Sequence, residues 1–130
     1  METCILVISH GNLCEELVRS AEMIMGTIEN VETLPLQEGV DPEEYMQALE
    51  ALLEKHNYRV MVLADLFGGT PFNSILRLSR ERDIPLVTGA NLPLLLEVAN
   101  LRDELEDPQE VLAQAASLAI AGMRWQWDLH

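Results

Sequence analysis

Short apolar runs alternate with amphipathic segments along most of the chain, and this alternation restricts the fold more than any other feature of the sequence. The apolar runs have the length of buried strands, and the segments between them carry apolar residues at helical spacing. Strands that alternate with helices form parallel sheets through right-handed crossovers, with helices on both faces. The sequence therefore predicts a doubly wound α/β fold. The expected strands are Cys4 to Ile8, Val31 to Leu36, Arg59 to Ala64 and Ile84 to Thr88.

The expected helices lie between residues that commonly begin and end helices. Asn12, followed by Glu15, fits an N-terminal cap, and Gly26 fits a stop. The pairs Asp41-Pro42 and Thr70-Pro71 each fit a cap followed by proline at the first helical position. The expected helices are 13 to 25, 42 to 56, 71 to about 82, a short helix after Asn91, and Pro108 to Ala121 with Gly122 at its end. In the first helix, the stripe expected to face the core is Leu13, Leu17, Val18, Ala21, Ile24 and Met25.

Pro35 indicates where the second strand lies in the sheet. Proline cannot donate to a strand ladder, so it is typical of an edge strand. The simplest strand order is then 2-1-3-4 in a four-stranded, mainly parallel sheet, which places the first and third strands side by side where the winding reverses. Ligands of open α/β sheets bind at that point, beyond the carboxyl ends of the strands.

Two chemically capable residues fall at this expected point. His10 comes shortly after the first apolar run, and Asp65 directly follows the third. A neutral imidazole can attack phosphorus through one ring nitrogen while a carboxylate fixes the tautomer through the other. The turn that follows Asp65 adds Gly68, Gly69 and Thr70, where backbone N–H groups and a helix N-terminus favour an anion. The pattern predicts a phosphoryl-transfer site that needs neither a metal nor a cofactor.

Composition narrows the classes of partner. The 22 acidic residues face seven arginines and one lysine, and the formal net charge of −14 disfavours nucleic acid and anionic membrane surfaces. The apolar runs are far shorter than the ~20 residues that span a bilayer. We expect one domain over residues 1–130 in the cytoplasm, with both cysteines reduced. The tail Met123 to Leu129, with Trp125 and Trp127, matches no motif; an extra edge strand there is one possibility.

Three motifs in order resemble the EIIA domain of the mannose family (mannose, fructose and sorbose) of sugar phosphotransferase systems. The resemblance extends over nearly the whole chain, and each motif follows an expected strand. A lone Ser-His-Gly would carry little weight, whereas three motifs in the expected places are specific. They are Ser9-His10-Gly11, Asp65-Leu66-Phe67-Gly68-Gly69-Thr70-Pro71-Phe72-Asn73 and Thr88-Gly89-Ala90-Asn91-Leu92-Pro93-Leu94-Leu95-Leu96-Glu97.

The resemblance implies a phosphocarrier whose active histidine is His10. The phosphoryl group would come from phosphorylated HPr and pass to a histidine of a IIB component, and the membrane components IIC and IID would be met only indirectly. The residue matching Asp65 hydrogen-bonds the histidine in the family, the residue matching Thr70 lies in the phosphoryl pocket, and members are commonly homodimers. Because two proteins must reach His10, we expect a shallow crevice with an apolar docking collar of Leu66, Phe67, Phe72 and Leu92.

Other interpretations of the same residues stay open at this point. His10 could be a structural strand-end histidine, and the glycine pair only a tight turn before a helix cap. The same histidine could serve a regulatory or binding module that does not transfer the group onward. A phosphohistidine phosphatase or mutase is disfavoured, because those enzymes usually carry Arg-His-Gly and a cationic pocket, whereas Ser9 precedes His10 here.

Overall fold

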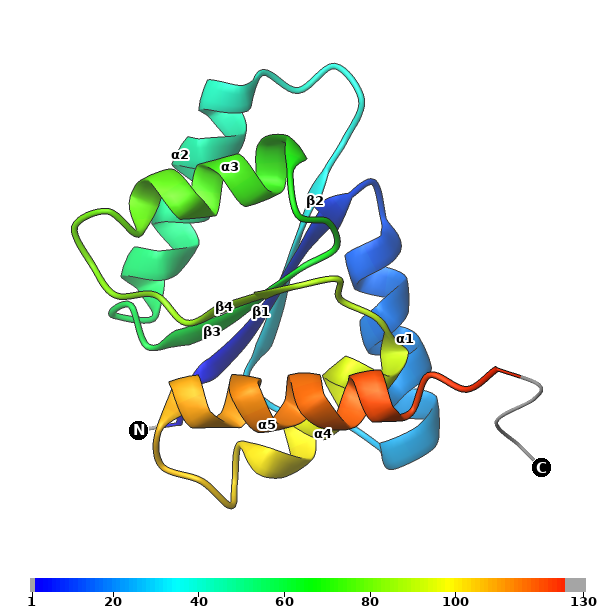
Figure 1. The fold of residues 1–130 in the computed structure, drawn as a ribbon. Coiled ribbons are helices and arrows are strands. Elements are labelled where there is room, and N and C mark those ends of the chain that lie inside the picture. The colour runs from blue at the N-terminus through cyan, green and yellow to red at the C-terminus, as the bar shows by residue number, and fades with distance from the viewer. Residues whose placement is uncertain (1, 126–130) are drawn as a thin grey trace.

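The computed structural model describes residues 2–125 and contains one sheet of four parallel strands in the order β2-β1-β3-β4 (Figure 1). The predicted architecture and strand order are therefore confirmed. The strands are β1 (Cys4–His10), β2 (Val31–Leu36), β3 (Val60–Ala64) and β4 (Leu86–Thr88). The helices are α1 (Leu13–Met25), α2 (Pro42–Lys55), α3 (Gly69–Leu78), α4 (Leu92–Leu101) and α5 (Pro108–Ala121).

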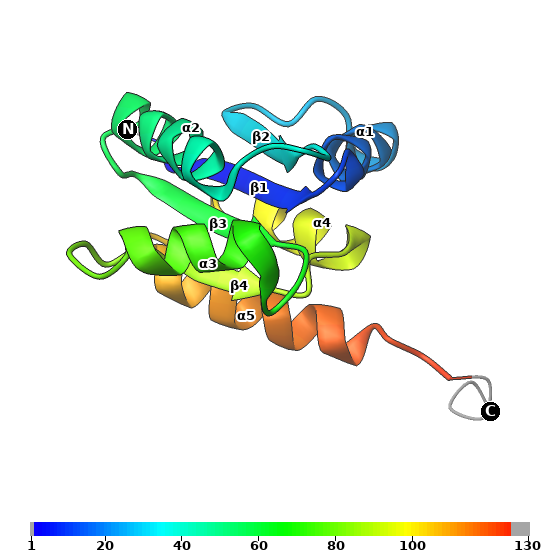
Figure 2. The same cartoon turned by 90° about the horizontal axis from the view of Figure 1, so that it is seen from above.

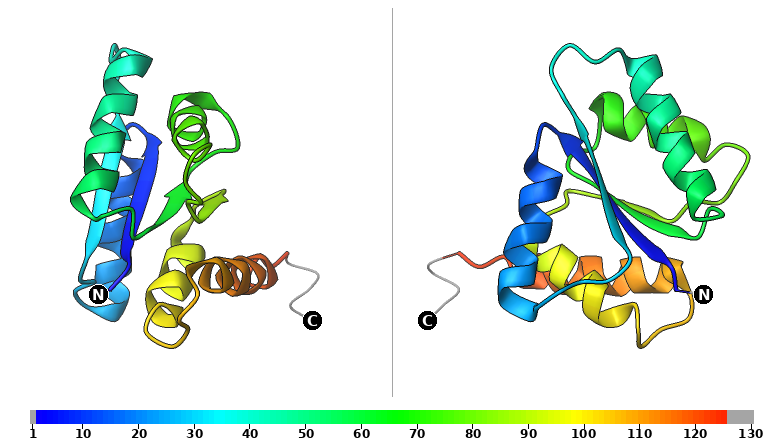
Figure 3. Two further views of the ribbon diagram at one scale, coloured as in Figure 1. Left: turned by 90° about the vertical axis from the view of Figure 1, so that its left-hand side faces the viewer. Right: turned by 180° about the vertical axis from the view of Figure 1, so that it is seen from behind.

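The two faces of the sheet are covered by different helices. Helices α2 and α3 pack together on one face, whereas α1, α4 and α5 cover the other (Figure 2). The side views in Figure 3 show α4 and α5 lying next to each other. In β1 the side chains alternate between the faces, as a strand requires: Ile5 and Val7 join the α1, α4 and α5 side, and Leu6 and Ile8 join the α2 and α3 side. The central strands are thus buried on both faces.

Several predicted boundaries were wrong. Strand β1 continues through His10, because Ser9 and His10 still pair with β2. Helix α3 begins at Gly69 rather than after Thr70, with Gly68 in the capping position, and it ends at Leu78. At that end the Ser79 hydroxyl donates to a helix carbonyl, that of Leu76, and such bonds compete with helix continuation. Strand β3 starts one residue later than predicted, and β4 only after Pro85.

The core-facing stripe predicted for α1 was wrong in part. The helix buries Cys14, Val18 and Ala21, but Leu13, Ile24 and Met25 are exposed. The helix runs beside β1 and β2 near the sheet edge, so only a narrow strip of its surface reaches the core. Its expected cap also differs: the Asn12 side chain makes no capping bond, and its Oδ1 accepts from Gln37 Nε2 at 2.7 Å.

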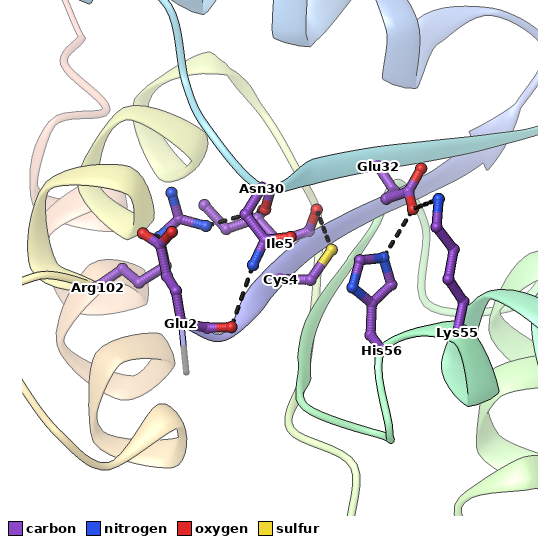
Figure 4. Close-up of polar contacts among 8 residues, drawn as sticks. All are labelled: Glu2, Cys4, Ile5, Asn30, Glu32, Lys55, His56 and Arg102. Atoms are coloured by element: carbon purple, nitrogen blue, oxygen red, sulfur yellow. Dashed lines mark hydrogen bonds and ion pairs between the residues drawn. The ribbon is translucent and has the colours of Figure 1, made fainter.

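The amino edge of the sheet is held together by charged side chains (Figure 4). The guanidinium of Arg102, only 6% exposed, donates to the carbonyl oxygens of Thr3, Glu29 and Asn30, and its Nε lies 3.2 Å from Glu2 Oε1. These contacts fasten the end of α4 to the starts of β1 and β2. A second cluster joins β2 to the end of α2: Glu32 Oε2 lies 2.7 Å from both Lys55 Nζ and His56 Nε2.

The C-terminal tail is described as far as Trp125. Residues 123–125 are neither helix nor strand, and Trp127 and the rest of the proposed edge strand lie outside the described residues. Between residues 2 and 125 there is no helix with the length and apolarity needed to cross a membrane.

Candidate active site

His10 and Asp65 meet at the carboxyl edge of the sheet, where β1 and β3 end side by side. In this pair Ile8 lies opposite Ala64, and the Asp65 N–H donates to the Ile8 carbonyl oxygen at 3.1 Å. The end of β1 points towards the start of α3 (Figure 1). The sequence prediction that the carboxyl ends of these two strands bring the imidazole and the carboxylate together is therefore confirmed.

One oxygen of Asp65 holds His10 in two ways. Asp65 Oδ2 accepts a hydrogen bond from the His10 backbone N–H at 2.9 Å and lies 3.0 Å from Nδ1 of the ring. The carboxylate is 12% exposed and the imidazole 45% exposed. The other oxygen, Oδ1, is buried and has no hydrogen-bond partner among the described residues. An ionised carboxylate accepts only, so a neutral ring bonded to it must donate from Nδ1 and keep the lone pair on Nε2.

Gly69 lies directly against this second nitrogen. A Cβ atom placed on Gly69 would be 2.7 Å from both Nε2 and Cε1 of His10, closer than real side chains come. Gly69 also has a φ of +81°, a conformation that favours glycine. The absence of a side chain therefore brings the imidazole against the backbone at the start of α3, where N–H groups have no intrahelical partners.

The remaining predicted site residues fall into separate places. Leu66 and Phe67 are exposed on the turn after β3, at 55% and 79%, and the Phe67 ring packs on Phe72 with centroids 4.8 Å apart. Thr70, in the first turn of α3, lines a cavity of about 240 Å³ between α2 and α3. Leu92 packs instead on the core beneath α4 and α5. The aromatic pair is thus next to the site, while Leu92 belongs to the packing of the opposite face.

Ser9 is a site residue whose contacts sequence reasoning missed. Its side chain is fully buried, and its hydroxyl bridges the Gly11 carbonyl and the Cys14 N–H. A hydroxyl at the end of an apolar strand, next to the histidine, was the available signal. The contact between Asn12 and Gln37 had no such signal, because it depends on how two loops meet.

The charges and nucleophiles around His10 are few. The four connections that form this edge, residues 9–12, 37–41, 65–71 and 88–92, contain no lysine or arginine. Burial raises the pKa of the Cys14 thiol near the site, and it raises that of Cys4, at the opposite end of β1, to about 11, so both thiols stay protonated at neutral pH. Within residues 2–125 no three histidine, cysteine or acidic side chains gather in a way that could hold a metal ion.

This geometry suits a nucleophilic imidazole. The carboxylate orients the ring from one side, and the other ring nitrogen, Nε2, faces a helix N-terminus that can stabilise an anion without a cationic side chain. Since the ring is about half exposed, a large partner can reach it directly.

Comparison with known proteins gives consistent results. The model of the EIIA-man family, described as the PTS system fructose IIA component, matches residues 4–116. The fructose-specific EIIA component of Bacillus subtilis is 36% identical over 106 residues, which cover 78% of this chain and 71% of that protein.

Two further relatives extend the similarity to nearly the full chain. The mannose-specific EIIAB component of Escherichia coli is 30% identical over 95% of this chain, which spans only 39% of that protein. The crystal structure of a phosphotransferase system EIIA component from Streptococcus agalactiae superposes with a TM-score of 0.86 at 28% identity, covering 93% of this chain and 95% of that one.

Proposed function

The chain belongs to the mannose-family EIIA components of sugar phosphotransferase systems, the phosphocarriers of sugar uptake, and from this premise we propose that His10 Nε2 is the atom that carries the phosphoryl group. The observation that supports this choice is the bond from Nδ1 to Asp65 Oδ2, which leaves Nε2 as the nucleophilic nitrogen. Gly68, Gly69 and Thr70 would give the group backbone N–H donors, and the Thr70 hydroxyl would add a further donor by turning from the cavity between α2 and α3 that this residue lines.

The proposed transfer exchanges one nitrogen–phosphorus bond for another. The lone pair of His10 Nε2 attacks phosphorus on the donor's phosphohistidine, and the electrons of the breaking bond return to the donor imidazole. Asp65 keeps the Nδ1 proton in place and stabilises the positive charge that the ring gains. The N-terminus of α3 stabilises the phosphoryl oxygens throughout. Transfer to the acceptor is the same step in reverse.

HPr is the proposed donor and a IIB component the proposed acceptor. The E. coli relative is an EIIAB component, whose name joins the A and B components in one protein, and this supports IIB as the next partner. The exposed Phe67, stacked on the half-buried Phe72, would form with Leu66 the apolar part of the surface that both partners contact. Leu92, also predicted for this collar, would act by supporting the start of α4. The proposed setting is the cytoplasm, with IIC and IID met only through IIB.

The test is the intact mass of the chain after incubation with phosphoenolpyruvate, enzyme I and HPr. We expect the native chain to gain one acid-labile phosphoryl group, about 80 Da, as for one covalent intermediate per nucleophile. His10→Ala should gain nothing, and His56→Ala, which removes the other histidine of the described residues, should behave as the native chain. If the native chain gains no mass while HPr itself is phosphorylated, the carrier assignment is refuted. If the chain gains the phosphoryl group but does not pass it to IIB, the result favours a regulatory module.

We also propose that the chain forms a homodimer through the outer side of α5 and β4. Leu118, Ile120, Met123 and Trp125 are each about half or more exposed there, beside an apolar cavity of about 210 Å³ and the edge strand β4. Exposed apolar patches next to a strand edge commonly mark interfaces.

Light scattering tests this proposal. The native chain should have about twice the monomer mass of 14.6 kDa. Ile120→Asp should lower the mass to that of a monomer, whereas Ile24→Asp, at an exposed apolar position on α1, should not. If only Ile24→Asp gives a monomer, the interface is on α1 and not on α5. A monomeric native chain would exclude the dimer.

A further inference from the structure

Ser9 is next to His10 in β1 and has no part in the transfer proposed above. Its side chain is 0% exposed, which is uncommon for serine. The hydroxyl donates to the Gly11 carbonyl oxygen at 2.8 Å and accepts from the Cys14 N–H at 2.9 Å. Both partners follow His10 in the sequence, so the Ser9 hydroxyl closes the turn that contains His10.

The two neighbours face opposite sides of the sheet. Ser9 continues the series Ile5 and Val7, which packs under α1, and its bond to Cys14 holds the first turn of that helix. His10 continues the other series and meets Gly69 at the start of α3. Consecutive strand residues point in opposite directions, so fixing the Ser9 side chain fixes the direction of His10.

The contacts of His10 require such a fixed direction. Its backbone N–H and its ring Nδ1 reach the same oxygen of Asp65, at 2.9 and 3.0 Å. A small rotation of the chain at residue 10 would break at least one of them. The next residue, Gly11, has a φ of +59°, and glycine resists such rotation least of all residues.

We propose that Ser9 is a positioning residue for phosphoryl transfer: its hydroxyl holds the turn between β1 and α1, so that His10 presents Nδ1 to Asp65 and Nε2 to the partner. This inference rests on the proposed role of His10. Without the hydroxyl, the Gly11 carbonyl and the Cys14 N–H both lose their partner, and the backbone on the far side of His10 is no longer tied to α1.

The experiment compares the native chain with Ser9→Ala and Ser9→Thr. The ¹⁵N spectrum of the histidine ring reports which nitrogen carries the proton, and rapid quench with phosphorylated HPr reports the transfer rate. We expect the native ring to be protonated at Nδ1. In Ser9→Ala the signal should shift towards a mixture of tautomers, and transfer should slow by about tenfold or more, because a displacement of about 1 Å can cost as much as a hundredfold. Ser9→Thr, which keeps the hydroxyl, should recover both.

Ser79→Ala is the matched control. It removes one hydroxyl bond of similar length, to the Leu76 carbonyl, at the far end of α3, and it should change neither the tautomer nor the rate. A Ser9→Ala chain with the native tautomer and the native rate would overturn the proposal. If that variant fails to fold, Ser9→Cys, which keeps the volume but bonds only weakly, serves the same test. A native chain that accepts no phosphoryl group would refute the carrier function, while the ring spectrum would still decide the role of Ser9.

Discussion

The imidazole of His10 is held on two sides, by a carboxylate at one nitrogen and by a bare backbone at the other. The first contact depends on chemistry and the second on the absence of a side chain. Substitutions at Asp65 and Gly69 therefore affect the proposed transfer for different reasons, and each has a matched control elsewhere in the chain.

Gly69→Ala should slow phosphoryl acceptance by at least about tenfold, because the new methyl group would displace the ring from its position by roughly 1 Å. The control is Gly26→Ala at the end of α1, where φ is +85° and a Cβ atom would meet nothing within 4 Å. Both variants should lose about 1–2 kcal/mol of stability from the left-handed conformation, measured by denaturant unfolding. Equal transfer rates in the two variants would mean that the close approach has no functional role.

Asp65→Asn should slow transfer by about a hundredfold or more, since an amide does not favour the Nδ1–H tautomer as a carboxylate does. Rapid quench with phosphorylated HPr measures this rate. Asp107→Asn is the control: Asp107 accepts from Gln109 N–H at the start of α5, and asparagine can keep that cap. A native rate in Asp65→Asn would leave the carboxylate with a structural role only.

At the residue level, the sequence was most informative where side chains follow adjacent strands directly. His10 and Asp65 could be predicted to meet because β1 and β3 are neighbours in the simplest order. The orientation of the ring could not be predicted, since it depends on Ser9, Gly69 and the backbone of the turn together. Leu92 was predicted for the collar; in the structure it is partly buried against the core beneath α4 and α5, and its role in docking stays a prediction.

Among the secondary-structure elements, β2 and α2 are joined by a charged cluster far from His10 (Figure 4). The hydrogen bond from Lys55, followed by the one from His56, lowers the pKa of Glu32 below its ordinary value of 4.5. A lowered folded-state pKa stabilises the protein above the unfolded pKa, and this contribution is lost as pH falls through the folded value.

Glu32→Gln should therefore lower Tm by about 2 °C at neutral pH, a small effect because solvent screens the cluster. The difference from the native chain should shrink as pH falls below 4.5 and vanish below the folded pKa. Thermal unfolding followed by circular dichroism at a series of pH values measures this. Glu54→Gln, at an exposed position in α2, is the control. A difference that persists unchanged in acid would mean that the cluster acts through packing.

Element types were easier to predict than element ends. The helices with a proline directly after a polar cap, α2 and α5, begin where the sequence indicates. The end of α3 was misplaced because the Ser79 hydroxyl gains a hydrogen bond to a helix carbonyl. The start of β4 was misplaced because Pro85 has no N–H to donate. Hydrophobic periodicity does not reveal single hydrogen bonds of this kind. The exposure of Ile24 and Met25 follows from the position of α1 near the sheet edge, which the helix's own pattern does not contain.

For the whole molecule, the two apolar cores share the strands that separate them. Ile5 and Leu6 are consecutive residues of β1 and belong to opposite cores, and Met61 and Val62 do the same in β3. Neither core can lose its packing while the other keeps an intact sheet. We therefore expect one cooperative transition with coincident curves from tyrosine absorbance, which reports the buried Tyr45, and from far-ultraviolet circular dichroism. Two separated transitions would contradict the proposal that the chain is one domain.

The bond between Asp65 and Nδ1 of His10 lies across the ring from the nitrogen proposed to receive the phosphoryl group. Loading and unloading at Nε2 therefore need not break the contact that holds the ring, and the free and loaded forms can share one conformation. Such a carrier needs no conformational change between accepting the phosphoryl group and donating it. Its turnover would then be governed by how often the two partners bind and dissociate. The direction of phosphoryl transfer would be governed by which partner is already phosphorylated.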